Sequence, residues 1–110
     1  MNIPVHMFAF ASEGDRSQIR YVDIPDEELT STKDIKSILE LVFKYGQNDF
    51  QRQPYPSVSV GDIAEVNGRF FMVLGSGWGE MTKEEFDNVP VPSSYSAYKL
   101  SFKKAALEDE

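Results

Sequence analysis

The residue types best suited to acid–base or metal chemistry are sparse in this chain. His6 is the only histidine, and it lies among apolar residues of a predicted strand. The chain has no cysteine, so it offers neither a cysteine-based zinc site nor a cysteine nucleophile. We therefore interpret His6 as a packed or edge histidine, and we predict no metal site, no cofactor and no catalytic residue.

Carboxylates gather after the second predicted strand, but their spacing is not that of a metal loop. A calcium loop supplies oxygen ligands at alternating positions around a central glycine, which is missing here. We interpret these residues as a solvated acidic loop: Asp23, Asp26, Glu27 and Glu28. Glu65 lies within a predicted hairpin, where it is a buried acid with a raised pKa, a residue at a sheet edge, or the partner of a base such as Arg52.

Three glycines surround the only tryptophan, at Gly75, Gly77 and Gly79. They lack the Gly-Lys-Ser/Thr ending and the long following helix of a phosphate-binding loop. We interpret the run as a flexible crossover that aims Trp78 inward.

Composition limits the remaining classes of function. The chain has 110 residues, a net charge of −7 and 41% hydrophobic residues. Direct binding to nucleic acid is not expected, because a phosphate-binding face needs clustered lysine and arginine. The first residues lack the pattern of a secretory signal, and no apolar run approaches about 18 residues. We therefore expect a cytoplasmic protein away from membranes, with one domain over residues 1–104 and a frayed acidic tail over 105–110.

The pattern of apolar residues predicts an α+β fold with a mixed or antiparallel sheet of four to six strands. Residues 3–11 and 18–24 alternate and are expected to form a hairpin, with the first strand inside the sheet. The main helix is predicted over 33–45 and packs on one face of the sheet. Ser31 or Thr32 is its expected N-cap, and Gly46 its C′ residue.

The strongest local signal is Asn67-Gly68 between two β-rich runs, which is typical of a two-residue type I′ hairpin over residues 63–74. This turn pairs Val66 with Arg69 and Ile63 with Met72, and it leaves both faces of the hairpin largely apolar. The predicted helix over 33–45 can cover only one face of this hairpin. The other needs the Trp78 segment, the 98–102 segment or another chain.

Two further elements follow the hairpin. Thr82 and Glu85 have the spacing of a capping box at the start of a short helix. Residues 95–104 fit a strand or a helix, and the sequence does not decide between them.

The middle of the chain carries a distinctive pattern, GQNDFQ at residues 46–51, PSVSVGD at 56–62 and then Gly77-Trp78. It resembles a group of small uncharacterised proteins of bacterial plasmids, phages and conjugative elements, and it is loosely similar to YodL-like segments. The resemblance covers about residues 35–80. It implies a bacterial or phage cytoplasmic setting and no particular reaction.

The polar loop in this pattern is open to two interpretations. It is a structured connector held by its own Asn and Asp side chains, or it presents a recognition surface. The candidate binding residues are Gln47, Asn48, Asp49, Gln51, Arg52, Tyr55 and Trp78.

Three hypotheses for function follow. The first is a non-enzymatic protein-binding accessory protein of a mobile element, whose partner is a protein such as a component of host defence. The alternative is a small-molecule-binding domain or minor enzyme with a pocket near Trp78 and Glu65. The third is a homodimer that covers the second face of the sheet with its own copy.

Overall fold

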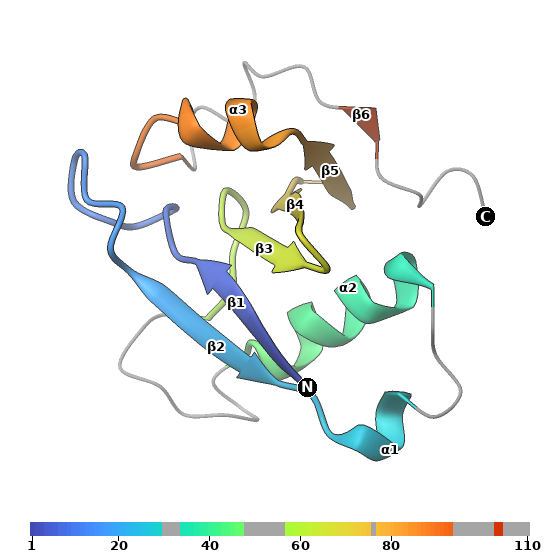
Figure 1. Cartoon of the computed structure of the whole chain (residues 1–110). Coiled ribbons are helices and arrows are strands. Elements are labelled where there is room, and N and C mark those ends of the chain that lie inside the picture. Colours follow the sequence, from blue (N-terminus) through green and yellow to red (C-terminus); the bar gives the residue numbers. More distant parts are fainter. Residues whose placement is uncertain (30–33, 48–56, 76, 94–102, 105–110) are drawn as a thin grey trace.

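A computed structural model describes residues 1–29, 34–47, 57–75, 77–93 and 103–104. They form an antiparallel six-stranded sheet in the order β2-β1-β3-β4-β5-β6, with helices on both faces (Figure 1). This confirms the predicted α+β class. The strands are β1 (Asn2–His6), β2 (Ile19–Asp23), β3 (Ile63–Val66), β4 (Arg69–Val73), β5 (Trp78–Met81) and β6 (Lys103–Lys104), and the helices are α1 (Asp26–Leu29), α2 (Ile35–Tyr45) and α3 (Lys83–Asp87).

The first hairpin pairs β1 with β2, and β1 lies inside the sheet as predicted. The prediction that the first strand continues to residue 11 is wrong. The N–H of Met7 still bonds the carbonyl of Gln18 at 2.8 Å, but the chain then leaves the ladder, since the N–H of Phe8 bonds the carbonyl of His6 at 2.9 Å. The side chain of Asp62 then accepts a hydrogen bond from the N–H of Ala9 at 3.0 Å. Phe10 consequently lies outside the sheet with 69% of its surface exposed.

The second hairpin, β3–β4, has the predicted register, with Val66 opposite Arg69 and Ile63 opposite Met72. Its turn has φ of 52° at Asn67 and 77° at Gly68, as a type I′ turn requires. Successive side chains of each strand point to opposite faces of the sheet, so the hairpin contributes to two separate cores.

Trp78 belongs to a strand, so the prediction of a flexible crossover is wrong. The glycine run instead makes a tight turn, in which the N–H of Leu74 bonds the carbonyl of Gly77 and Gly77 adopts a φ of 82°. β5 then pairs with β4, with Trp78 opposite Val73. Trp78 does point inward, as predicted, and is buried.

Helix α2 covers one face of the sheet with Ile38, Leu39 and Val42. Its N-cap is Asp34, whose carboxylate accepts a hydrogen bond from the N–H of Ser37 at 3.4 Å. The prediction of a cap at residue 31 or 32 is therefore wrong. Both of those residues lie outside the described part of the chain.

Gly46 ends α2, but for a different reason than predicted. Its φ is −81°, so it is not the left-handed C′ residue of a helix. A Cβ at this position would lie 2.4 Å from Val58 Cγ2 and 2.8 Å from the carbonyl oxygen of Val42. Glycine is required here because the segment after the loop packs directly against the helix end.

Helix α3 covers part of the opposite face and begins with the predicted capping box of Thr82 and Glu85. Phe86 stacks on Phe70, with ring centroids 4.4 Å apart. Phe70 and Phe71 are both buried within the chain, on opposite sides of the sheet. The outer face of the second hairpin therefore does not need another chain to cover it.

The C-terminal part of the chain is described only at Lys103–Lys104, which pairs with Gly79 and Glu80 as β6. The question of strand or helix over 95–102 and the expected tail over 105–110 lie outside the described residues. None of the described helices is long and apolar enough to cross a membrane.

Candidate interaction surface

Two of the residues predicted to bind a partner fall in the described part of the chain. The Gln47 amide donates hydrogen bonds to the carbonyls of Phe43 at 2.9 Å and Val58 at 3.2 Å. It thus ties the end of α2 to the segment that follows the loop, which is the role of a structured connector. Trp78 is buried against the α2 side of the sheet. The other candidates lie outside the described residues: Asn48, Asp49, Gln51, Arg52 and Tyr55.

A pocket shared by Trp78 and Glu65 is ruled out by the register of the sheet. Glu65 lies opposite Phe70 and shares its face, whereas Trp78 lies opposite Val73 on the other face. Successive side chains of a strand point to opposite sides. The two residues are therefore separated by the sheet itself.

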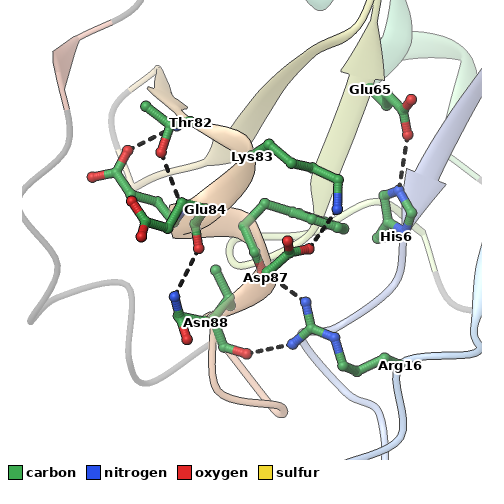
Figure 2. Close-up of polar contacts among 11 residues, drawn as sticks. His6, Arg16, Glu65, Thr82, Lys83, Glu84, Asp87 and Asn88 are labelled. Atoms are coloured by element: carbon green, nitrogen blue, oxygen red, sulfur yellow. Dashed lines mark hydrogen bonds and ion pairs between the residues drawn. The ribbon is translucent and has the colours of Figure 1, made fainter.

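His6 and Glu65 form an acid–base pair beside α3, at 3.3 Å between Nε2 and Oε1 (Figure 2). The imidazole also packs against Phe86, with ring centroids 4.7 Å apart. Burial lowers the pKa of His6 from its ordinary value, while Glu65 acts in the opposite direction. The pair fits the interpretation of a packed histidine and gives Glu65 a basic partner in His6, whereas Arg52 lies outside the described residues.

Figure 2 also shows how α3 is held on the sheet. The Arg16 guanidinium donates to the carbonyls of Phe86 at 2.7 Å and Val89 at 2.6 Å, at the C-terminal end of the helix. Cations at this end also interact favourably with the helix dipole. Arg16 therefore ties the loop before β2 to the C-terminal end of α3.

Strand β2 forms an edge of the sheet, and its hydrogen bonds show which backbone groups face outward. Gln18 and Ile24 bond Met7 and Met1 across the hairpin, which fixes the alternation of bonded pairs along β2. In an antiparallel ladder only every second residue bonds a given neighbour. The N–H and C=O groups of Ile19 and Tyr21 therefore point away from β1. The described part of the chain places no strand on that side.

The side chains along this edge are also accessible. Tyr21 has 57% of its surface exposed, and Ile19 and Pro4 beside it are half-buried. They lie on the α3 side of the sheet, because Tyr21 pairs with Pro4 and Ile19 with His6. Figure 1 shows that β2 extends away from α3, so α3 does not cover this end of the sheet.

Acidic side chains cluster where β2 ends and α1 begins. Asp23 and Asp26 have side chains that are 73% and 97% exposed, and Glu27 is exposed beside them. The N-terminal ammonium lies 3.8 Å from Asp23 and 3.6 Å from Asp26. Among the described residues, no group of three histidine, cysteine, aspartate or glutamate side chains is placed to hold a metal ion. Three exposed carboxylates and the N-terminal ammonium therefore meet at this end of the edge strand.

We define the edge surface as the outer side of β2, including Ile19 and Tyr21, together with the acidic end at Asp23, Asp26 and Glu27. The strand and the acidic residues after it were predicted from the sequence, but their position at one edge of the sheet was not. The sequence predicts that the first two strands pair, but it does not indicate that β2 is the last strand on its side of the sheet.

Comparison with known proteins does not identify a relative: no family model, curated protein or solved structure matches the chain.

Proposed function

We propose that this protein is a non-enzymatic protein-binding module whose edge surface receives an extended, basic segment of a partner protein. The observation that carries the proposal is the outward-facing backbone of Ile19 and Tyr21 on β2, which is an edge strand in the described part of the chain. Extended peptides bind such edges by adding a strand: main-chain hydrogen bonds supply affinity, and alternate side chains supply specificity.

The composition of β2 supports pairing with another strand. Natural proteins commonly protect exposed edges with lysine, proline or a bulge. The outer positions of β2 carry Ile19 and Tyr21, both residues that favour strands, and only Asp23 is charged. This strand therefore retains the features that allow a further strand to bind.

The charge of the surface determines which segment fits. Lysine and arginine at the end of a bound strand would lie near Asp23 and Asp26, within the range of about 8 Å over which charges interact at physiological salt. A second copy of this chain is a poorer match, because its own acidic end and net charge of −7 add repulsion.

The biological setting in this proposal comes from the sequence pattern. The resemblance to small proteins of bacterial mobile elements supports a cytoplasmic accessory protein, and an antagonist of a host defence component is one such role. Nucleic-acid-binding proteins carry basic surfaces, and an acidic module is complementary to them.

A peptide-binding experiment tests the surface. The probe is a fluorescent peptide of about seven residues, a length near that of an ordinary strand, in which lysine alternates with threonine and valine. The control peptide has glutamate in place of lysine. We expect saturable binding of the lysine peptide only, weakened by salt. Binding of both peptides alike would contradict the charge argument.

Two variants at one position separate backbone pairing from side-chain contact. Tyr21→Pro removes the outward N–H but leaves the bonds of β2 to β1, because proline is tolerated on the free side of an edge strand. Tyr21→Thr removes the ring and keeps the N–H. We expect Tyr21→Pro to abolish binding and Tyr21→Thr to retain most of it, with thermal unfolding showing that both are folded. Equal loss in both variants would contradict strand addition.

Photo-crosslinking in a bacterial lysate tests the natural partner. Benzoylphenylalanine in place of Tyr21 should crosslink a basic, extended segment, whereas the same group in place of Phe43 on α2 should not. Crosslinked segments that are acidic, or that come equally from position 43, would overturn the proposal.

A further inference from the structure

A cavity of about 210 Å³ opens at the end of the first hairpin. Its walls come from the loop after β1, from the residues just before β2, and from Asp62 at the start of the second hairpin. The residues that matter for its chemistry are Phe10, Asp15, Gln18 and Asp62.

Asp62 is almost completely buried at the wall of this cavity. Its two carboxylate oxygens accept hydrogen bonds from the backbone N–H groups of Ala9, at 3.0 Å, and Ser59, at 2.8 Å. An ionised carboxylate has about four acceptor positions, so these bonds leave capacity for a further donor.

Asp15 supplies a second carboxylate from the segment before β2. The Ser17 hydroxyl at 2.6 Å, the Ser17 N–H at 3.0 Å and the Gln18 amide at 3.1 Å all donate to it. These bonds lower the pKa of Asp15, the Ser17 hydroxyl most. Asp15 therefore stays ionised over the physiological range in a fixed position.

Phe10 belongs to neither core, and it is the most exposed large apolar residue of the described chain. It lines the same cavity together with Met7 and Ala11. An exposed aromatic ring beside carboxylates is a common environment for a cationic group, because both the ring face and the acids attract positive charge.

We propose that this cavity binds a small organic cation, a primary ammonium or guanidinium group on a short apolar stem. The charged groups among its described lining residues are both acidic, and apolar side chains complete the wall. The volume lies below the range of about 300–1,000 Å³ that drug-sized ligands occupy, so the ligand is a small molecule or a single basic side chain. The inference uses different residues from the edge surface and does not depend on the proposed function.

The cavity also predicts a direction for the effect of pH on binding. Burial raises the pKa of Asp62 to about 6, against the opposing effects of the Ala9 and Ser59 N–H groups and of Arg20. Among the described residues, Arg20 interacts with its charge and Asp15 lines the same cavity. Protonation of Asp62 removes an acceptor for the cation, so affinity should fall as the pH decreases from about 7.5 to about 5.

An NMR titration with n-butylammonium chloride is the direct test, with n-propylguanidinium as the second cation and 1-butanol as the uncharged control. We expect saturable shifts at Phe10, Asp15 and Gln18 with the cations only. N-acetyl-lysine methylamide separates the two sources: if it binds as well as butylammonium, the ligand is a basic side chain of another chain, and if it is excluded, the ligand is a free small cation.

Matched variants complete the test. Asp15→Asn should weaken butylammonium binding by about tenfold, the effect of losing one charge-assisted contact. Phe10→Ala should also weaken it, and this exposed position leaves the fold intact. Glu13→Gln removes an equal charge from the same loop outside the cavity and should have little effect. The proposal is overturned if neither cation shifts the cavity resonances, if butanol binds equally well, or if Glu13→Gln weakens binding as much as Asp15→Asn.

Discussion

The buried carboxylate of Asp62 should make the protein more stable as the pH falls from about 7 to about 4. Its pKa is about 6 in the folded protein and 3.8 as the ordinary value. A difference of about two pKa units corresponds to about 3 kcal/mol of free energy of unfolding. Asp62 costs the folded state about that much at neutral pH, and protonation removes the cost.

The direction of this pH effect on stability follows from the number of protons bound by the folded and the unfolded protein. Between pH 3.8 and about 6 the folded protein holds a proton on Asp62 more often than the unfolded chain does. Stability therefore decreases as the pH rises through this window and is constant above it with respect to Asp62. His6 acts in the opposite direction, because burial lowers its pKa and its contribution to stability is lost as the pH falls.

Asp62→Asn isolates the contribution of Asp62, because His6 and the surface acids are common to both proteins. Asparagine keeps one acceptor for the N–H groups of Ala9 and Ser59 and never ionises. The assay is urea unfolding of both proteins from about pH 4 to pH 7.5, with the free energy of unfolding extrapolated to water. We expect wild type to gain about 3 kcal/mol relative to the variant as the pH falls.

The pH dependence of the difference in free energy of unfolding between wild type and Asp62→Asn tests the raised pKa of Asp62. A difference that does not change with pH would refute the raised pKa of Asp62. A difference of opposite sign would mean that Arg20 and the two backbone N–H groups stabilise the ionised form more strongly than burial penalises it.

The remaining predictions concern packing around α2. Leu39→Ala should lower the free energy of unfolding by about 2–5 kcal/mol, because Leu39 is fully buried, whereas Phe43→Ala, at a site 42% exposed on the same helix, should cost much less. Equal losses in urea unfolding would contradict the packing of α2. Gly46→Ala should cost about 1–3 kcal/mol through its clash with Val58, while Gly75→Ala, with open space around it, should be nearly neutral. A neutral Gly46→Ala would contradict the close approach.

The elements that the sequence predicts best are those fixed by neighbouring residues. Asn67-Gly68 determines the turn of the second hairpin, and this turn determines the pairing of β3 with β4. Thr82 and Glu85 likewise define the start of α3 by bonds within one helical turn. In both cases a few adjacent side chains determine the geometry.

The errors arise where distant residues determine the outcome. The glycines before Trp78 allow either a crossover or a tight turn, and pairing with β4 selects the turn. A glycine directly after a helix is typical of a left-handed helix end, but Gly46 is required because Val58 packs closely against it. After His6 the N–H of Phe8 bonds the carbonyl of His6, and the N–H of Ala9 then bonds Asp62, far away in the sequence, so the strand does not continue to residue 11.

The surfaces proposed for function depend on such long-range arrangements. The edge position of β2 results from the order of the whole sheet. The cavity brings Asp15 and Asp62 together from two different hairpins. Sequence patterns alone found the acidic residues near β2, but they did not place Asp62 in the interior.

Hydrogen exchange at the amides of β2 tests the central claim most directly. In the free protein, Arg20 and Val22 bond β1 and should exchange slowly, whereas Ile19 and Tyr21 face outward and should exchange fast. Saturation with the alternating lysine peptide should slow Ile19 and Tyr21 and leave Arg20 and Val22 unchanged. Slow exchange of Ile19 and Tyr21 in the free monomer, or no change at saturating peptide, would contradict strand addition at this edge.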